Sequence, residues 1–335
     1  MNDWLKNLIG SHQRTALPIL TTPGIALAKA DPQKVFQSGT LQAEIIRNLA
    51  EKLPAMAAAL TMMDLSVEAE AFGAPIQFGN DENPNVSAAI VSDRPGIDAL
   101  AVPEVGTART KENLLAAKLC ASTIADRPTL GGIIGPFSLA GRLLDMGKMM
   151  LLTATEPETV HALLEKTTQF LTVYVQAFKE TGCHGIIMAE PAAGLVSPAM
   201  CDAFSSSYIR KIVEAVQDEH FVVVLHNCGR TEKMVSSMLS TGAGAIHVGN
   251  AADIRKILEQ TPETIPVMGN LDPSNIFLMG TVEEVRAETL RLLEATQSYP
   301  HFVLSSGCDI PLGAPMANIH AFFDALAQYC AENKK

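Results

Sequence analysis

Short apolar runs alternate with longer stretches of helical periodicity along most of this chain. The runs are rich in Val, Ile, Leu and Met and lack polar alternation, which is typical of strands buried on both faces of a parallel sheet. We expect eight such strands, at residues 17–21, 60–64, 129–134, 185–188, 221–226, 245–248, 265–269 and 301–305. The pattern therefore predicts an α/β protein.

Helical periodicity fills the intervals between these runs, for example at residues 31–53 and 110–125. Local sequence marks three further helix starts. Thr155 precedes an acidic, proline-containing first turn and is predicted to cap one helix, and Ser197 before a proline is predicted to cap another. Thr281 is followed three residues later by a glutamate, so a capping box is expected there.

Eight strands that alternate with helices favour a (β/α)8 TIM barrel, with residues 1–335 as a single domain. The surplus length lies in an N-terminal helical extension and in a long loop after the second strand. That loop carries Pro75, Pro84 and Pro95 and is expected to lie over the barrel mouth. A doubly wound open sheet is the alternative fold. No G-x-G-x-x-G or G-x-x-x-x-G-K-[ST] motif follows a strand, which disfavours a nucleotide-binding protein.

The composition allows a large core and narrows the choice of partners. Of 335 residues, 47% are hydrophobic and 18% are charged, which excludes a disordered chain. The net charge of −11 and the 5% aromatic content argue against a nucleic-acid partner, because phosphates attract Lys and Arg and bases stack on aromatic rings. No signal peptide is visible, and no apolar run reaches the ~18 residues of a membrane span. We expect a cytoplasmic protein without a membrane partner.

Candidate chemistry gathers where the expected strands end. His226 and Cys228 are two residues apart at the end of the fifth run, so both side chains face the same side of an extended chain. Cys308 leaves the eighth run at its corresponding end, which a barrel would bring to the same mouth. Imidazole and thiolates together select zinc, and three protein ligands leave a fourth position open for substrate. The alternative is a buried cysteine beside a histidine bonded to the backbone.

The other cysteines and histidines are expected to be structural. Cys183 and His184 precede their strand and would lie at the opposite, stabilising end of a barrel. His247 lies inside the sixth run, where a packed core histidine is favoured over a residue of the site. Three further cysteines lie on helical patterns and are expected to be core thiols: Cys120, Cys201 and Cys330.

Several polar residues follow other strand ends and are candidates for substrate contacts or for orienting metal ligands. They are Asp64, Glu68, Glu190, Asn270, Asp272 and Asp309. For each of them, a helix cap or a loop hydrogen bond is the alternative. Glu70 is expected to be solvated.

At these residues the chain resembles the uroporphyrinogen decarboxylase superfamily, and within it the methylcobalamin:coenzyme M methyltransferase branch. The matching stretches run in order over most of the chain, and the first ~60 residues match least. The stretches are 63–73, 135–140, 190–198, 226–229 (His-Asn-Cys-Gly), 269–273 (Gly-Asn-Leu-Asp-Pro) and 305–311 (Ser-Ser-Gly-Cys-Asp-Ile-Pro). The resemblance implies a (β/α)8 barrel and zinc ligands at His226, Cys228 and Cys308.

The resemblance further implies transfer of a methyl group from methylcobalamin, or from a methylated corrinoid protein, to a small-molecule thiol such as coenzyme M. The substrate thiolate is then the nucleophile, and no protein residue is expected in that role. The corrinoid would arrive on a separate protein, because the chain has no D-x-H-x-x-G motif. Arg142 and Arg230 are the nearest basic candidates for the sulfonate of coenzyme M, with a surface or ion-pair role as the alternative.

Three other functions stay open at this point. Decarboxylases of the superfamily carry an Arg-Gln-Ala-Gly-Arg stretch near the N-terminus and lack the zinc cysteines, whereas residues 17–24 here read Leu-Pro-Ile-Leu-Thr-Thr-Pro-Gly. Metal-free decarboxylation of a tetrapyrrole is therefore disfavoured. A methyl-folate-dependent zinc thiol methyltransferase shares the H-x-C pattern, and a non-enzymatic module that binds a corrinoid protein is the third alternative.

Overall fold

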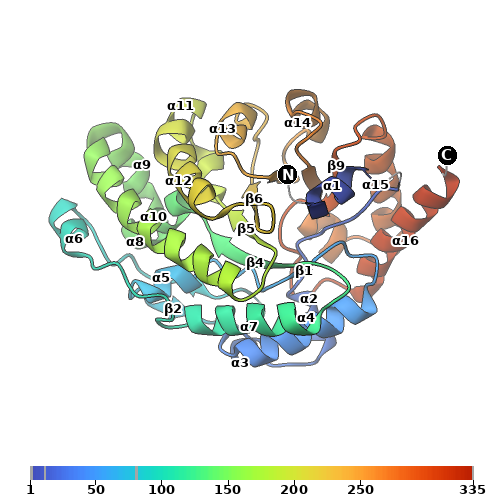
Figure 1. Cartoon of the computed structure of the whole chain (residues 1–335), viewed down its shortest axis with the longest axis horizontal. Coiled ribbons are helices and arrows are strands. Elements are labelled where there is room, and N and C mark those ends of the chain that lie inside the picture. Colours follow the sequence, from blue (N-terminus) through green and yellow to red (C-terminus); the bar gives the residue numbers. More distant parts are fainter. Residues whose placement is uncertain (1–2, 11–12, 80–81, 334–335) are drawn as a thin grey trace.

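Seven parallel strands form the main sheet of the computed structural model, which describes residues 3–10, 13–79 and 82–333. The strands are β1 (Ala59–Leu60), β4 (Thr129–Ile134), β5 (Gly185–Ala189), β6 (Val222–Asn227), β7 (Ala245–Val248), β8 (Val267–Leu271) and β9 (Phe302–Ser306). They neighbour one another in chain order, and every adjacent pair is parallel. Figure 1 shows the sheet curled inside an arc of helices, as in a TIM barrel.

The expected first strand at residues 17–21 is wrong. Ala16 alone makes parallel bridges, to Met56 on one side and to Leu304 in β9 on the other. Ala57 N donates to Ala16 O at 2.9 Å, and Leu17 N donates to Leu304 O at 2.8 Å. Pro18 follows immediately and has no N–H to donate, which prevents a continuous ladder. A single bridging residue therefore joins the two edges of the sheet.

The helices that follow the strands cover the outer face of the sheet, as Figure 1 shows. They are α7 (Thr110–Thr123), α8 (Pro136–Leu144), α9 (Met146–Thr155), α10 (Pro157–Glu180), α11 (Pro198–Cys201), α12 (Ser207–Val216), α13 (Val235–Leu239), α14 (Ile254–Gln260), α15 (Val282–Ala295) and α16 (Met316–Glu332). Short helical turns of other types are η1 (Pro191–Leu195), η2 (Asp202–Ser206) and η3 (Pro273–Leu278). The predicted helix at 110–125 is confirmed by α7.

The N-terminal part of the chain is mainly helical. It contains α1 (Asp3–Gly10), α2 (Pro23–Leu27), α3 (Pro32–Phe36) and α4 (Gly39–Lys52). The helical pattern at 31–53 is therefore two helices, because Ser38 adopts an extended conformation and its hydroxyl accepts a hydrogen bond from Leu41 N at the start of α4.

The long segment between β1 and β4 has secondary structure of its own. It contains α5 (Val67–Ala71), an antiparallel pair of β2 (Ile76–Gln77) with β3 (Asn85–Val86), and α6 (Arg94–Ala99). This segment supplies part of the wall of the cavity described below.

Both faces of the strands are buried, as their unbroken apolar sequence predicts. In β6, Val222 and Val224 face the inside of the curled sheet, where they join Leu17 and Met268 in one cluster. Val223 and the other alternate residues pack outward against the helices in a second, larger cluster. Side chains of successive residues point to opposite faces of a strand, so each strand stabilises two cores.

Two of the three predicted helix caps are confirmed. The Thr281 hydroxyl accepts from Glu284 N while the Glu284 carboxylate accepts from Thr281 N, which is a complete capping box. Ser197 caps α11 through Met200 N. Thr155 does not cap α10: it is the last residue of α9, and Glu156 precedes α10 instead.

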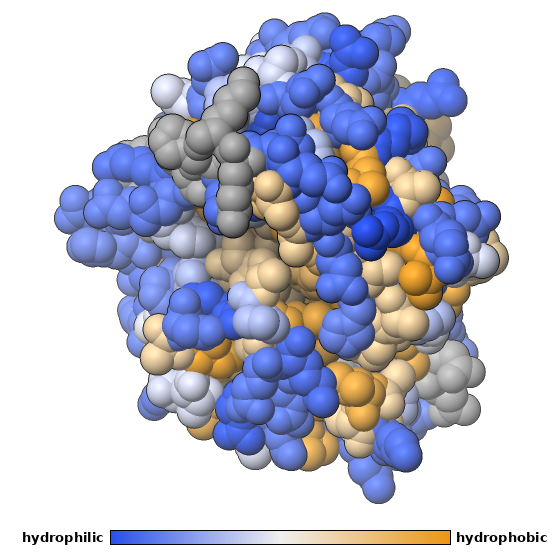
Figure 2. Space-filling view, turned by 90° about the vertical axis from the view of Figure 1, so that its right-hand side faces the viewer, coloured by the Kyte–Doolittle hydropathy of each residue, from blue (hydrophilic) through white to orange (hydrophobic). Residues whose placement is uncertain are grey.

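Hydrophilic residues cover most of the face on the side of α15 and α16, and Figure 2 shows hydrophobic residues gathered around a central hollow there. Over the described residues, no helix combines the length and the apolar character needed to cross a bilayer.

The two threonines allow a matched test of the capping box. We expect Thr281→Ala to lower the free energy of unfolding by about 1 kcal/mol, because the backbone N–H of Glu284 in the first turn of α15 loses its partner, the Thr281 hydroxyl. Thr155→Ala is the control and should change stability by less than about 0.5 kcal/mol. Urea unfolding at equilibrium measures both, and equal effects would contradict the assignment.

Candidate metal centre

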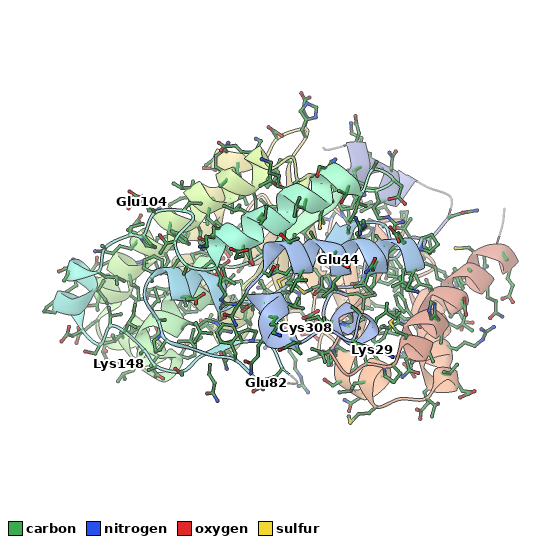
Figure 3. The ribbon with its side chains drawn as sticks, turned by 90° about the horizontal axis from the view of Figure 1, so that it is seen from below. Lys29, Glu44, Glu82, Glu104, Lys148 and Cys308 are labelled. Carbon is green, nitrogen blue, oxygen red and sulfur yellow. The ribbon has the colours of Figure 1, made fainter. Side chains whose placement is uncertain are left out.

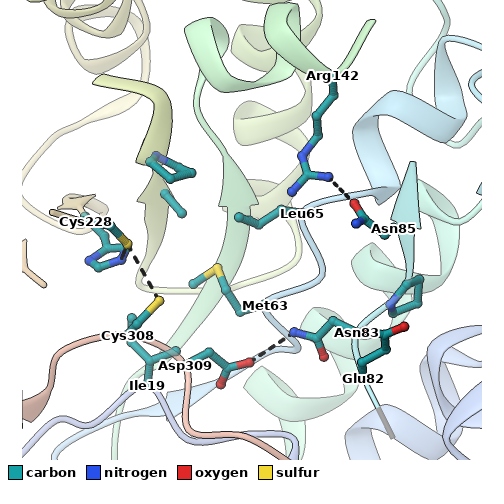
Figure 4. Close-up of a pocket in the computed structure, with 14 residues that line it drawn as sticks. Ile19, Met63, Leu65, Glu82, Asn83, Asn85, Arg142, Cys228, Cys308 and Asp309 are labelled. Carbon is teal, nitrogen blue, oxygen red and sulfur yellow. Dashed lines mark hydrogen bonds between the residues drawn. The ribbon is translucent and has the colours of Figure 1, made fainter. Parts of the chain in front are cut away.

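One imidazole and two thiols meet at the carboxyl edge of the sheet. His226 lies near the end of β6, Cys228 follows that strand, and Cys308 follows β9. The distance from His226 Nε2 to Cys228 Sγ is 2.9 Å, and the two Sγ atoms are 3.8 Å apart. All three ligand atoms lie within 4.8 Å of one another. The structure therefore brings together the three residues that the sequence singles out as candidate metal ligands, and Figure 4 shows two of them, Cys228 and Cys308.

Glycines allow the loops that carry the thiols to pack closely. Gly229 has a φ of +84°, in the left-handed region that glycine adopts without steric cost. A Cβ on Gly307 would lie 2.4 Å from Asn250 N, closer than any side chain allows. The residue after Cys228 is therefore a glycine because of its backbone conformation, and the residue before Cys308 is a glycine because no space is left for a Cβ atom.

The donor set fits a tetrahedral cation with soft ligands. Two sulfurs bound to one zinc ion at about 2.3 Å would lie roughly 3.8 Å apart, which is the separation of the two Sγ atoms. The 2.9 Å between His226 Nε2 and Cys228 Sγ is a hydrogen-bond distance, so this pair must widen to admit a cation. Each of the three residues offers one ligand atom, and a fourth position is left for a substrate.

The pKa values of the two thiols are shifted in opposite directions. The hydrogen bond from Cys228, with the nearby His226, holds the pKa of the Cys308 thiol below its usual range despite burial. The same pairing with Cys308, together with burial, raises the pKa of Cys228. One thiolate thus forms readily, and a cation that replaces the shared proton would stabilise the second.

A second histidine, His247, contacts His226 of this cluster. His247 Nδ1 lies 2.8 Å from His226 Nδ1, and burial lowers the pKa of His247 well below its usual value, so the ring is neutral. The sequence predicts His247 as a core histidine; it is fully buried, but it also contacts the site. His247 reaches the site because β6 pairs with β7 in a register that places His226 opposite His247.

A cavity of about 350 Å³ opens beside the three ligands. Residues that follow β1, a residue of β5 and the β2–β3 segment line it together with His226, Cys228 and Cys308, and Figures 3 and 4 show Glu82 of that segment in the same region as Cys308. The apolar lining is Ile19, Met63, Leu65, Pro84, Ala189 and Pro191, and the remaining polar lining is Glu82, Asn83, Asn85, Arg142 and Asp309. The volume suits a small molecule.

Two predicted residues lie in this cavity. Asp309 accepts a hydrogen bond from Asn83 Nδ2 at 3.3 Å, and burial, with the Cys308 thiolate next to it, raises its pKa well above the usual value. Arg142 donates to Asn85 Oδ1 at 2.7 Å on another wall of the cavity. Arg230 is exposed and does not line the cavity.

Asp64 lies in an ion-pair network instead of beside the ligands. Its carboxylate pairs with the buried Arg109 and accepts from Ser66 N at 2.9 Å. Arg109 Nε also donates to Glu70 at 2.5 Å, and its guanidinium stacks over Phe78. Glu70 is therefore ion-paired, and the expectation that it is merely solvated is wrong. Its partner, Arg109, lies 39 residues further along the chain, so the local sequence does not indicate the pair.

Two other predicted carboxyl groups are completely buried near the start of α8. Glu68 Oε1 accepts from Ile134 N at 3.2 Å, and burial raises the pKa of Glu68 to about 8. Glu190 accepts from the N–H groups of Phe137 and Ser138, and burial raises its pKa to about 7. Neither group lines the cavity.

Asn270 and Asp272 hold loops in place. Asn270 Nδ2 donates to the carbonyl oxygens of Gly249 and Ala252. Asp272 accepts from two N–H groups at the start of η3, so the cap that the sequence left as an alternative is what the structure shows. Neither lines the cavity that adjoins His226, Cys228 and Cys308.

The remaining cysteines lie away from this centre, as expected. Cys120, Cys183 and Cys201 are buried, and Cys330 is half-buried. Burial raises the pKa of Cys120 to about 12 and that of Cys183 to about 11, which leaves both thiols protonated.

A model of the uroporphyrinogen decarboxylase (URO-D) family matches residues 22–329, and the chain belongs to this family. Among relatives, a protein named methylcobamide:CoM methyltransferase MtbA from Methanosarcina mazei is 29% identical over 309 residues, covering 90% of this chain and 86% of that one. A uroporphyrinogen decarboxylase from Pseudomonas aeruginosa (strain LESB58) is 26% identical over 324 residues, covering 91% and 88%. The family resemblance seen in the sequence is thus confirmed.

Solved structures support the fold. A structure described as a methyltransferase from Methanosarcina mazei superposes with a TM-score of 0.87 at 24% identity and covers 97% of both chains. A B12-independent methionine synthase from Shewanella sp. W3-18-1 superposes with a TM-score of 0.58 at 12% identity, covering 96% of each chain. At these identities the likeness establishes the shared fold.

Glu68 is predicted to make stability depend on pH. Its folded pKa of about 8 exceeds the ordinary value of 4.5, so its contribution is complete below pH 4.5 and is lost as the pH rises through 8. We expect Glu68→Gln, which cannot ionise, to gain stability relative to the parent protein between pH 5 and pH 9, by on the order of a few kcal/mol. Urea unfolding across this range measures the effect.

The exposed Glu294 on α15 provides the control, and Glu294→Gln should leave the pH profile of stability unchanged. A Glu68→Gln profile parallel to that of the parent protein would contradict the raised pKa.

Proposed function

We propose that this protein is a zinc-dependent corrinoid methyltransferase. It moves a methyl group from methylcobalamin, or from a methylated corrinoid protein, to a small-molecule thiol such as coenzyme M. The observation that carries the proposal is the His226, Cys228 and Cys308 cluster, which opens onto a small cavity in a URO-D family chain. Relatives that bear the name methylcobamide:CoM methyltransferase support the choice of reaction.

His226, Cys228 and Cys308 would hold the zinc ion. A zinc ion held there would lower the pKa of a bound substrate thiol and so supply a thiolate at neutral pH. The protein residues position that thiol and keep water from it: Met63, Leu65 and Ile19 form an apolar wall beside the ligands. Low local polarity leaves the sulfur weakly solvated and therefore more nucleophilic.

The transfer itself is a displacement at carbon. The substrate sulfur forms a bond to the methyl carbon while the cobalt–carbon bond breaks, and the electron pair of that bond stays on cobalt. The proton of the thiol leaves to solvent before this step. No side chain of the protein is consumed, so the contribution of the chain is to orient the two substrates.

The corrinoid would be presented by a separate protein above the cavity. Glu82 and the neighbouring residues of the β2–β3 segment line the cavity, and residues 75–100, which include them, would be the segment that such a partner meets. Within it, residues 80–81 lie outside the described part of the chain. We propose that residues 1–335 form one domain of a cytoplasmic enzyme.

The decarboxylase alternative has one observation in its favour, the 26% identity to the Pseudomonas enzyme. Against it stand the pair of thiols in the cavity and the apolar segment at 17–24, which offers no arginine to tetrapyrrole carboxylates. A methyl-folate donor is distinguished by experiment, since the zinc ligands would be the same.

Metal content tests the ligand assignment. We expect His226→Ala and Cys308→Ser to lose stoichiometric zinc, and the transfer rate to fall by more than about a hundredfold, because losing even a group that only orients a ligand costs 10- to 100-fold. Elemental analysis and the visible spectrum of methylcobalamin during turnover with a thiol measure both. The matched control is Cys330→Ser, which removes a thiol remote from the cluster and should keep zinc and activity.

A parent protein that is active without zinc would favour the decarboxylase alternative. Turnover with methyl-tetrahydrofolate but not with methylcobalamin would favour the folate alternative. Stoichiometric zinc without turnover of either donor would favour a module that only binds a corrinoid protein.

Arg142 tests the identity of the thiol. If the acceptor carries an anionic end, the guanidinium is its donor, and Arg142→Gln should raise KM for 2-mercaptoethanesulfonate by about tenfold or more with little change in kcat. KM for the neutral 2-mercaptoethanol should not change. Arg230→Gln is the control, because Arg230 lies outside the cavity. Equal effects on both thiols would exclude Arg142 from this role.

A further inference from the structure

His226 is held by a second histidine as well as by the neighbouring thiol. In the pairing of β6 with β7, the Cα atoms of His226 and His247 are partners, so the two rings extend side by side from adjacent strands. The rings meet at 77°, with their Nδ1 atoms 2.8 Å apart. His247 is completely buried and His226 is 2% exposed, so water does not compete for this contact.

The contacts continue to the segment that bridges the sheet edges. His247 Nε2 lies 2.8 Å from Ser305 Oγ, and that hydroxyl donates to the carbonyl oxygen of Leu17 at 2.7 Å. Ser305 is a buried residue of β9, and Leu17 directly follows the bridging Ala16. The series His226, His247, Ser305 and Leu17 therefore links the metal ligand to a main-chain carbonyl.

The position of every proton in this series follows from its last member. A carbonyl oxygen only accepts, so the single hydroxyl proton of Ser305 is used on Leu17, and Ser305 Oγ must accept from His247 Nε2–H. A neutral imidazole has one N–H, so His247 Nδ1 is an acceptor and His226 Nδ1 is the donor. In the neutral form of His226, Nε2 then carries the lone pair, and Nε2 is the atom that faces Cys228.

We propose that His247 is a positioning residue that fixes His226 in the Nδ1–H tautomer and so directs the Nε2 lone pair toward the two thiols. Ser305 and the Leu17 carbonyl hold His247 in turn in its Nε2–H tautomer. The identity of the cation as zinc rests on the proposed function, whereas the tautomers belong to the protein alone. A ligand whose lone pair is already directed binds a cation without first moving a proton.

Zinc affinity tests the role of His247. His247→Phe keeps the volume of the ring and removes the acceptor, and we expect its zinc affinity to fall by about 10- to 100-fold. His247→Asn places an amide oxygen near the position of Nδ1 and should restore most of the affinity. Ser305→Ala frees His247 to adopt either tautomer and should give an intermediate loss. Competition with a chromophoric chelator at fixed pH measures all three.

The control is His301→Phe. His301 is also buried, at 1% exposure, but it precedes β9 at the opposite end of the strand, so its replacement should leave zinc affinity unchanged. Equal losses in His301→Phe and His247→Phe would show that the effect is general destabilisation and would overturn the proposal. Affinity of His247→Phe equal to that of the parent protein would also overturn it.

The tautomers are read directly by NMR on the metal-free, full-length parent protein labelled with ¹⁵N-histidine. We expect the His226 signals, identified by their absence in His226→Gln, to show a protonated Nδ1 and an unprotonated Nε2. An Nε2–H tautomer at His226 would overturn the proposal even if no variant folds. If the tautomers are as expected and the parent protein binds no zinc, the proposed function fails while the positioning of His226 by His247 stands.

Discussion

The curl of the parallel sheet is the constraint on which the candidate site depends. β6 and β9 are three positions apart in the sheet, which would separate them by roughly 14 Å if the sheet were flat. The Sγ atoms of Cys228 and Cys308, which follow these strands, are 3.8 Å apart. The curl of the sheet brings the ends of both strands together, and the contact between His247 and Ser305 lies on the same inward side. The packing of the outer helices and of the inner apolar cluster therefore bears directly on the positions of His226, Cys228 and Cys308.

Much of the fold was predictable because its strands are uniformly apolar. The bounds of β4 and β7 agree with the apolar runs, and the other runs after residue 128 differ from their strands by one or two residues. The run at 17–21 looks the same by composition, but Pro18 removes a donor that a ladder needs, and only the bridge at Ala16 forms. Composition alone does not distinguish a paired strand from an apolar segment that passes through the same core.

The meeting of His226, Cys228 and Cys308 was predictable because spacing and strand ends are local properties of a sequence. The contacts of His247, Arg109 and Glu70 were not, because each depends on a partner that is distant in sequence and on the register between elements. Asp64 and Asp272 illustrate the same limit: a carboxylate after a strand is equally suited to a metal, an arginine or a helix start. The structure selects among these by placing Arg109 beside Asp64 and the N–H groups of η3 beside Asp272.

The distance along the chain between the two thiols has a mechanical consequence. Cys228 and Cys308 are 80 residues apart, and the chain between them includes β7, β8 and β9. A cation bound to both sulfurs would close this long loop in the way that a disulfide does, but reversibly, and so restrict the unfolded chain. The bound cation would then cross-link the C-terminal half of the sheet, and its release would destabilise the strands that bring Cys228 and Cys308 together.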